Sequence, residues 1–286
     1  MIIRTPAKVN LFLDVIERQS SGFHTLQTIL QAVSLFDEIT IRKSANTRVL
    51  TSHKGLKGTH NIVEDAVHAL KQRYAGVGNF RFDIKKRIPL GAGMAGGSSD
   101  AAAALCGINI LSGLGLNHQE LAGIGKDIGK DIPFFLKGGL QIGRHYGEEL
   151  EWIKSRPVYY FLIIYPGFGI STKESYQDLN PDTFNQGAVR FKKLVRALKT
   201  GDYGSIKANL YNIFEANAFK KKPLLRQIKA DLMEAGADNS LMSGTGSAVF
   251  GLFRTRIQAE KTKKKLKKNY KNIILSSGFY RELFTD

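Results

Sequence analysis

The stretch that decides the fold runs from Pro89 to Ala104 and reads Pro-Leu-Gly-Ala-Gly-Met-Ala-Gly-Gly-Ser-Ser-Asp-Ala-Ala-Ala-Ala. Its glycines permit positive φ and let an anion approach the backbone amides closely. Ser98 and Ser99 stand where an alanine-rich helix would begin, so unpaired N–H groups and the positive end of the helix dipole face the loop. Residues 80–85, just before the loop, alternate between apolar and charged side chains as a strand does. Strand, glycine loop and helix together predict a phosphate-binding site.

Other glycine-rich motifs fit this loop less well. Residues 91–96 match the dinucleotide fingerprint, but residues 111–116 read as a helix end and a turn where that motif needs an acidic residue after a second strand. A Walker A loop needs a lysine between its glycines and its serine, and none precedes Ser98. The partners of the protein-kinase glycine loop, His-Arg-Asp and Asp-Phe-Gly, do not occur in the sequence. A glycine turn that only caps a buried helix is the remaining alternative.

Length and composition are those of a globular protein. The 286 residues, 43% hydrophobic and 23% charged, can form one large domain or two lobes. Cys106 is the single cysteine, so an intramolecular disulfide and a cysteine metal cluster are excluded and a reducing, cytoplasmic location is expected. The first residues lack a basic-then-apolar leader and no apolar run approaches about 18 residues, so we expect neither secretion nor a membrane partner.

The chain is strongly basic, with 42 basic and 25 acidic side chains and a net charge of +17. Seven lysines gather between Lys261 and Lys271. This run could bind nucleic acid or an anionic membrane, or it could be the solvated face of a helix that begins near Thr255. We favour the solvated helix and do not expect a nucleic-acid partner, and positive charge would also attract a polyphosphate substrate.

Hydrophobic periodicity predicts a two-lobed α+β protein that binds its ligands between the lobes. Asn61 is a candidate N-cap, and a soft boundary near residue 154 divides the chain into domains 1–154 and 155–286. Strands are expected at 8–16, 38–43, 80–85, 159–165, 237–242, 248–253 and 272–276, and helices at 62–74, 98–111, 118–128 and, with interruptions near Gly201 and Pro223, 186–235.

Two further segments carry groups that suit phosphate chemistry. Ser243-Gly-Thr-Gly-Ser247 is a second glycine loop, which could form another anion nest or a plain turn between strands. Lys8 and Asn10 share one face of the first strand. A lysine turned inward there would need a paired anion, whereas on an edge strand it would be exposed.

A candidate base lies in the near-repeat Lys126-Asp-Ile-Gly-Lys130-Asp131. Asp131 precedes Ile132-Pro133, a sequence that disfavours helix and turns the chain. Its carboxylate could accept a proton from a substrate hydroxyl. Asp127 is a competitor, and either residue could simply cap a helix.

On these motifs the chain resembles the GHMP kinases, the galactokinase–homoserine kinase–mevalonate kinase group. Residues 89–102 are similar to the second motif of that group and residues 243–247 to the third. Residues 6–13, 22–28 and 131–135 resemble the isoprenoid-precursor kinases of the group that act on a diphosphocytidyl sugar alcohol. The motifs occur in family order from residue 6 to residue 251, nearly the whole chain.

The resemblance implies a two-lobed kinase, monomeric or homodimeric, that phosphorylates the 2-hydroxyl of this small-molecule substrate with ATP and Mg²⁺. It implies that Asp131 is the general base and that Lys8 orients Asp131 and the hydroxyl. The ATP-binding residues it implies are Pro89, Gly91, Gly93, Gly96, Gly97, Ser98 and Ser99 for the phosphates, with Asn61 and Lys86 near the adenine. The substrate-binding residues it implies are Phe23 and Tyr176 on either side of the cytosine, His24 at its edge, and Asn10, Thr172 and Thr245. It names no metal ligands.

The chain departs from the family pattern at three positions. Phe23 stands where tyrosine is usual, Ala95 replaces a loop glycine, and Lys130 replaces a small residue beside the implied base. Two alternatives to the substrate assignment are a kinase for mevalonate or homoserine, and a basic RNA-binding protein on a related α+β fold. Neither of those kinase substrates carries a base for Phe23 to stack on, and RNA binding would leave both glycine loops without a role.

Overall fold

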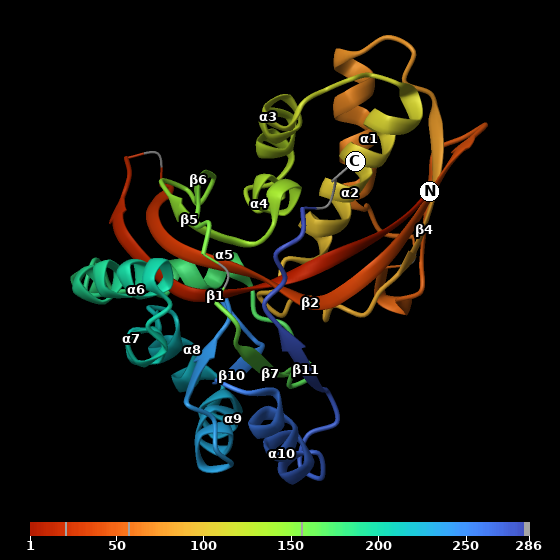
Figure 1. Cartoon of the computed structure of the whole chain (residues 1–286). Helices are drawn as coiled ribbons and strands as arrows, with labels where there is room; N and C mark the ends of the chain where they lie inside the picture. Colours follow the sequence, from red (N-terminus) through yellow and green to blue (C-terminus); the bar gives the residue numbers. More distant parts are fainter. Residues whose placement is uncertain (21, 57, 156, 283–286) are drawn as a thin grey trace.

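The computed structural model describes residues 1–20, 22–56, 58–155 and 157–282 of the chain (Figure 1). The strands are β1 (Ile2–Arg18), β2 (His24–Ser44), β3 (Arg48–Thr51), β4 (Asn79–Lys85), β5 (Leu140–Arg144), β6 (Glu149–Trp152), β7 (Tyr160–Ile164), β8 (Tyr211–Asn212), β9 (Asn239–Met242), β10 (Val249–Phe253) and β11 (Ile273–Ser277). The α-helices are α1 (Ile62–Arg73), α2 (Gly96–Ser112), α3 (His118–Ile128), α4 (Ile132–Lys137), α5 (Thr172–Gln177), α6 (Ala188–Thr200), α7 (Tyr203–Ala208), α8 (Glu215–Lys221), α9 (Pro223–Glu234) and α10 (Arg256–Leu266). Short 3₁₀ turns cover Lys54–Leu56 and Pro181–Thr183.

The strands form two sheets, and both carry helices. The larger sheet has the order β3-β4-β2-β1-β8, with β5 paired to the first half of β2 and β6 paired to β5. The smaller sheet has the order β11-β7-β10-β9. In Figure 1, helices α1 to α4 lie above the larger sheet, and α9 and α10 lie below the smaller one. This arrangement confirms the predicted α+β class.

Strands β1 and β2 cross the middle of the molecule as a long antiparallel pair (Figure 1). The sequence predicts only residues 8–16 and 38–43 as strand, but both strands extend well beyond these limits. Residues 5–15 of β1 are buried without alternation, because elements of both halves cover this strand. Its register with β2 shifts at three irregular points, which allow so long a pair to curve.

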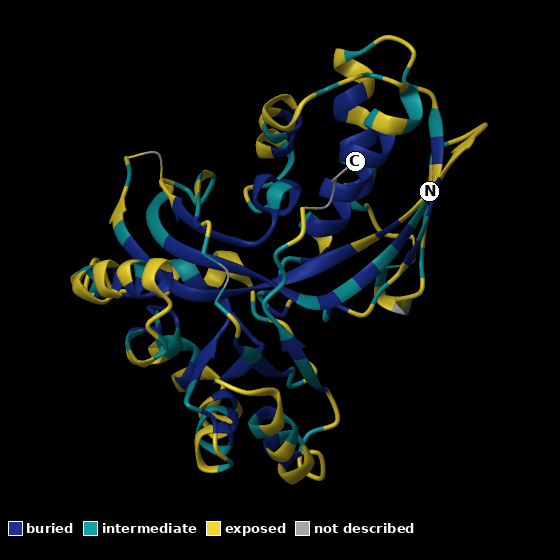
Figure 2. Cartoon of the chain, viewed as in Figure 1, coloured by how far each residue is buried: buried dark blue, intermediate teal, exposed yellow. Residues whose placement is uncertain are grey.

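Helix α2 packs closely on the larger sheet because its buried side chains are small. Residues 101–104 are four fully buried alanines, and Gly107 sits against Ile41 of β2, where a Cβ would lie 2.4 Å from the isoleucine side chain. Figure 2 shows this helix as mostly dark and buried, whereas α1 and α3 are exposed over part of their surfaces. The close packing fixes the N-terminus of α2 above the sheet.

Local signals set several helix ends. Asn61 accepts a hydrogen bond from the Val63 amide and completes a capping box with Glu64, as its predicted role as N-cap requires. Thr255 caps α10 by accepting a hydrogen bond from the Gln258 amide, although the nearby Ile257 is exposed rather than packed. None of the helices in the described ranges combines the length and apolar character that a bilayer crossing requires.

In the middle of the chain one expectation is wrong and one strand was not predicted. Ile132-Pro133 does not prevent helix formation, because α4 begins at Ile132 and proline in the first helical turn loses no intrahelical hydrogen bond. Strand β5, which follows Gly138 and Gly139, was not among the predicted strands.

The predicted domain boundary near residue 154 falls between β6 and β7, which belong to different sheets. One hydrophobic cluster nevertheless joins side chains of both halves, among them Phe12 of β1, Phe161 of β7 and Phe250 of β10. Strand β8 also pairs with β1 across this boundary. The division into 1–154 and 155–286 therefore stays a prediction.

Candidate active site

Two adjoining cavities lie between the halves of the molecule, and Asp131 lines both. The first, of about 320 Å³, is bordered by residues 89–98 and by Gly244 and Thr245, and we call it the glycine-loop cavity. The second, of about 750 Å³, is bordered by Phe23, His24, Tyr146, Tyr176 and Phe184, and we call it the aromatic cavity. The predicted phosphate loops and the predicted base-binding residues thus border neighbouring spaces.

The two glycine loops are in direct contact. Gly91 and Gly93 have φ of 61° and 72°, which favours glycine. The backbone amide of Ala248 donates to the carbonyl of Ala92 at 3.1 Å, so the strand that follows the second loop holds the first. The predicted pairing of the loops is therefore present, and both contribute to one cavity wall.

Helix α2 begins at the wall of the glycine-loop cavity. Its first intrahelical hydrogen bond runs from the Ser99 amide to the Ala95 carbonyl at 3.1 Å, so the amides of Gly96, Gly97 and Ser98 have no partner within the helix. These three residues line the cavity, where their amides and the helix dipole suit a phosphate. Ser99 does not line it: its side chain is buried, and its hydroxyl has no hydrogen-bond partner in the part of the chain that the structure describes.

Ala95, one of the departures from the family pattern, precedes α2 in the left-handed region, with φ 53° and ψ 37°. A Cβ is strained in this conformation. The alanine is partly buried and packs against the core under α2.

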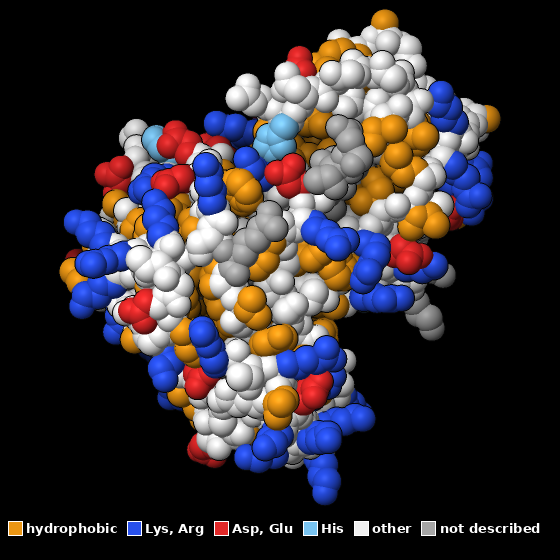
Figure 3. Space-filling view, in the orientation of Figure 1, with side chains coloured by type: hydrophobic (Ala, Val, Ile, Leu, Met, Phe, Trp, Pro, Cys, Tyr) orange, Lys and Arg blue, Asp and Glu red, His pale blue; other side chains and the backbone are white. Residues whose placement is uncertain are grey.

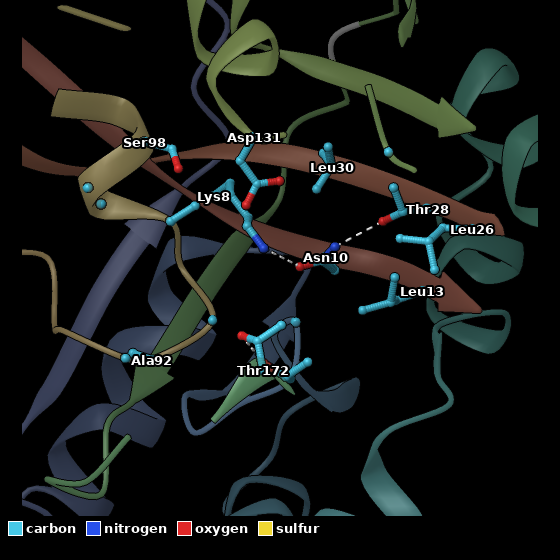
Figure 4. A pocket seen from close by; sticks show the side chains of 18 of the residues that line it. Lys8, Asn10, Leu13, Leu26, Thr28, Leu30, Ala92, Ser98, Asp131 and Thr172 are labelled. Carbon is cyan, nitrogen blue, oxygen red and sulfur yellow. Dashed lines mark hydrogen bonds between the residues drawn. The ribbon is translucent and has the colours of Figure 1, made fainter. Parts of the chain in front are cut away.

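Lys8 is buried at the floor of the glycine-loop cavity, with 5% of its surface exposed. Its ammonium donates to Oδ1 of Asn10 at 2.7 Å, and the Asn10 amide donates to the Thr28 hydroxyl at 2.9 Å (Figure 4). The Thr28 hydroxyl in turn donates to the Phe12 carbonyl at 2.8 Å. This chain of hydrogen bonds fixes the positions of Lys8 and Asn10 on β1.

Asp131 faces the same space from the start of α4 (Figure 4). Burial lowers the pKa of Lys8, and the nearby Asp131 carboxylate opposes this shift. The Asp131 carboxylate does not cap α4, so it is free to accept a proton from a bound molecule. A buried cation and a carboxylate therefore face one cavity, and the two groups do not form an ion pair with each other in the described part of the chain.

The structure separates the two candidate bases. Asp127 lies on the outside of α3, where Arg73 pairs with it at 2.9 Å, and it borders neither cavity. Lys130 is exposed, with its ammonium 5.8 Å from the centre of the Tyr146 ring. It lines the aromatic cavity rather than the floor where Lys8 lies.

The aromatic cavity brings together Phe23, His24 and Tyr176. The His24 ring lies 5.0 Å from the Tyr176 ring at 35°, and Phe23, which is 59% exposed, lies 5.5 Å from Tyr146. Burial and then the positive charge of Arg18 lower the pKa of His24, which favours the neutral imidazole. Burial, together with the charge of Asp131, raises the pKa of Tyr176.

Sequence reasoning missed Tyr146 and Phe184. Tyr146 sits between His145 and Gly147, so a histidine, an aromatic residue and a glycine stand here in the reverse of the order in Gly22-Phe23-His24, and this likeness was the available signal. Phe184 contacts His24 edge-to-face at 5.9 Å, and no local pattern marks it.

Thr172 and Thr245 meet where the two halves face each other. Thr172 is the first residue of α5 and Thr245 belongs to the second glycine loop, and their hydroxyl oxygens lie 3.3 Å apart. Both border the glycine-loop cavity (Figure 4).

Two expected adenine-binding residues do not line either cavity. Asn61 uses its side chain to cap α1. Lys86 turns its ammonium inward, onto the carboxylates of Asp37 and Asp100. The structure therefore does not bring these side chains to the other site residues.

A glycine loop at a helix N-terminus, a second glycine loop against it and a carboxylate opposite a buried lysine define a small-molecule kinase of the GHMP type. The sequence signatures described as GHMP kinases N terminal domain and GHMP kinases C terminal match residues 61–139 and 194–272. Over 98% of both chains, the protein is 37% identical to the 4-diphosphocytidyl-2-C-methyl-D-erythritol kinase of Syntrophomonas wolfei. It therefore belongs to the GHMP kinases and, among them, to the family of 4-diphosphocytidyl-2-C-methyl-D-erythritol kinases.

Solved structures agree with this assignment. A crystal structure of 4-(cytidine 5'-diphospho)-2C-methyl-D-erythritol kinase is similar with a TM-score of 0.83 and 29% identity, over 98% of this chain and 100% of that one. The homoserine kinase of Cytophaga hutchinsonii, with a TM-score of 0.77 and 21% identity over 99% and 95% of the two chains, shares the fold.

Proposed function

We propose that this protein transfers the γ-phosphoryl group of ATP to the 2-hydroxyl of 4-diphosphocytidyl-2-C-methyl-D-erythritol, a step in non-mevalonate isoprenoid precursor biosynthesis. The observation that carries the proposal is the position of Asp131, which borders both the glycine-loop cavity and the aromatic cavity. A phosphoryl donor in the first and an acceptor in the second would meet at this carboxylate. The full-length likeness to kinases named for this substrate supports the same reaction.

ATP would bind with its phosphates against the first turn of α2 and the loop before it. The amides of Gly96, Gly97 and Ser98 supply donors there, and Lys8 supplies positive charge. Asp131 is the carboxylate in the wall of this cavity, and the described residues hold no cluster of three or more acidic, histidine or cysteine side chains fit for a metal. Such a wall suits Mg²⁺, which binds through phosphates, waters and one or two carboxylates and would neutralise phosphate charge when present.

The chain's own chemistry would centre on Asp131 and Lys8. As the substrate oxygen bonds to the γ-phosphorus, the bond from that phosphorus to the ADP oxygen breaks and the hydroxyl proton passes to Asp131. A positioned base of this kind contributes roughly 10²- to 10⁴-fold to the rate. Lys8, held by Asn10, would orient the carboxylate and the hydroxyl.

The aromatic cavity suits a cytidine diphosphate group. We infer that the cytosine lies between Phe23 and the neighbouring rings of His24 and Tyr176, with neutral His24 available to read the edge of the base. Cationic Arg18, Lys130 and Lys173 border this cavity, and Asp131 is the acidic residue among its lining side chains. The excess of positive charge would attract the diphosphate.

Neither alternative, a kinase for mevalonate or homoserine or an RNA-binding protein, would use both the glycine-loop cavity and the aromatic cavity. Mevalonate and homoserine carry no base for the aromatic cavity. The lysine run lies on α10 and just after it, where Figure 3 shows Lys and Arg side chains gathered at the lower end of the molecule, and none of these lysines borders either cavity. We assign the reaction to the cytoplasm, where a buried free thiol such as that of Cys106 stays reduced.

Product analysis tests the proposal. After incubation with Mg²⁺-ATP and the cytidyl substrate, phosphorus NMR should show one new phosphomonoester and an unchanged diphosphate link in the product. A product phosphorylated elsewhere, or cleavage of the diphosphate, would contradict it.

A further inference from the structure

A buried cluster of charged side chains lies beneath the glycine loop and outside both cavities. It consists of Asp37 on β2, Lys86 just after β4, and Asp100 on α2. All three side chains are at most 4% exposed. Burying charged groups costs free energy of folding unless each one is paired and hydrogen-bonded. We therefore asked what the charges of this cluster hold in place.

The cluster holds the first stem of the loop. Oδ1 of Asp37 accepts hydrogen bonds from the backbone amides of both Arg87 and Ile88, the residues that lead into Pro89. Oδ2 of the same carboxylate accepts from the Lys86 ammonium. Asp37 therefore fixes three consecutive residues at the start of the loop.

It also holds the second stem. The Lys86 ammonium donates to Oδ2 of Asp100 at 2.7 Å, and Oδ1 of Asp100 accepts from the Thr5 hydroxyl at 2.9 Å. Asp100 lies in the second turn of α2, directly behind Ser98 and Ser99. A Cβ at Gly96 would lie 3.3 Å from Oδ2 of Asp37 and 2.9 Å from the Ile88 side chain, so the first residue of α2 packs on the same carboxylate.

We propose that Lys86, Asp37 and Asp100 are positioning residues that close the base of the phosphate loop and aim the first amides of α2 at the nucleotide. Lys86 acts from inside the protein and does not contact ATP. The inference rests on the proposed ATP site but not on the identity of the acceptor.

The charges of the cluster agree with this role. Burial acts to lower the pKa of Lys86, but the two carboxylates outweigh it and raise the value, so Lys86 stays charged. Burial raises the pKa of Asp100 to about 6, with Lys86 opposing and the Asp37 charge reinforcing the shift. Lys86 is therefore the cation that links the two buried carboxylates.

Two amide substitutions form a matched test. In Asp37→Asn, one oxygen can still accept from Arg87 and Ile88, but the new NH₂ group faces the Lys86 ammonium, so two donors meet. In Asp100→Asn, the oxygen can still accept from Lys86 and the NH₂ group can donate to the Thr5 hydroxyl, which can accept. The same chemical change therefore breaks the cluster at one position and leaves it connected at the other.

The readout is binding of ADP and, separately, of CDP, by calorimetry on the full chain. For Asp37→Asn we expect ADP affinity to fall roughly tenfold or more, with CDP affinity unchanged. For Asp100→Asn we expect both affinities to stay within roughly threefold of those of the unaltered protein. Failure of CDP to bind the unaltered protein would contradict the proposed substrate while leaving the ADP comparison intact.

Three results would overturn the proposal. Unchanged ADP affinity in Asp37→Asn would limit the cluster to a role in folding. Tighter ADP binding would mean that a released Lys86 reaches the phosphates. An equal loss of ADP affinity in Asp100→Asn would show that ADP affinity does not depend on the hydrogen bonds of the cluster, because this variant keeps them.

If Asp37→Asn also lowers the free energy of unfolding, hydrogen exchange distinguishes a local effect on the loop from a general loss of stability. The proposal expects faster exchange confined to the hydrogen-bonded amides of Arg87, Ile88 and Ser99. A uniform increase along the chain, with no excess at the loop, would contradict it.

Discussion

Gly93 and Ser243 join the two glycine loops across the interface between the halves of the molecule. The Ser243 hydroxyl donates to the Gly93 carbonyl at 2.9 Å, and a Cβ built at Gly93 would lie 2.1 Å from the Ser243 carbonyl oxygen. The backbones are thus too close for any side chain at residue 93. The proposed nucleotide site therefore depends on close packing between segments that lie far apart in the sequence.

This contact predicts a large effect of Gly93→Ala. Gly115 has a similar φ of 68°, but no atom lies within 4 Å of its Cβ position, so Gly115→Ala measures the cost of backbone strain alone, which we expect to be about 1 kcal/mol. Gly93→Ala adds overpacking against backbone, typically a further 1–3 kcal/mol, and should reduce ATP affinity. Urea denaturation checks both values. Equal losses of stability in the two variants would mean that the loops are not tightly packed.

Asp131→Asn should abolish turnover while leaving the binding of nucleotide and acceptor largely intact. The amide keeps the size of the side chain but cannot take the hydroxyl proton, and a loss of roughly 10²- to 10⁴-fold is expected. Asp127→Asn is the matched control, because its carboxylate pairs with Arg73 outside the cavities. Steady-state measurement of turnover in both variants tests this prediction. Near-normal turnover in Asp131→Asn would move the base elsewhere.

Phe23→Ala should weaken binding of the cytidyl group by about 1–3 kcal/mol, the usual contribution of an aromatic side chain that stacks a base. Since Phe23 is 59% exposed, the substitution should leave the fold unchanged. Phe23→Tyr keeps the ring and should retain affinity. Calorimetric titration with CDP is the measurement, and unchanged CDP affinity in Phe23→Ala would remove this residue from the cytosine site.

The elevated pKa of Asp100 predicts a specific pH dependence of stability. The folded value of about 6 lies above the ordinary 3.8, so the folded state binds more protons. Its stabilising contribution is complete below the unfolded pKa and is lost as pH rises through about 6. Relative to Asp100→Asn, the unaltered protein should therefore gain roughly 1–2 kcal/mol between pH 7.5 and pH 5. Denaturant unfolding of both proteins at the two pH values checks this prediction. A difference in their free energies of unfolding that does not change with pH would contradict it.

Features with a local cause could be predicted from the sequence. The glycine loop before α2, the Asn61 cap and the Thr255 cap each follow from residues within a few positions of one another. The α+β class followed from periodicity in the same manner. Ala95 departs from the family pattern at a loop position that usually holds glycine, but its positive φ was not predicted.

Features that depend on distant partners could not be predicted. The sequence pairs Lys86 with neither Asp37 nor Asp100, which lie 49 and 14 residues away, so its place in a buried cluster was not foreseen. The first half of β2 becomes strand because β1 and β5 flank it. Tyr146 reaches the aromatic cavity only because the turn that follows β5 brings it opposite Phe23.

The most direct test of the central claim is ADP release by the purified protein with Mg²⁺-ATP and 4-diphosphocytidyl-2-C-methyl-D-erythritol, beside mevalonate, homoserine and no acceptor. The account predicts rapid ADP release that requires the cytidyl substrate and is absent with the other acceptors. Equal release with mevalonate or homoserine, or no release with any acceptor although ATP binds, would contradict it.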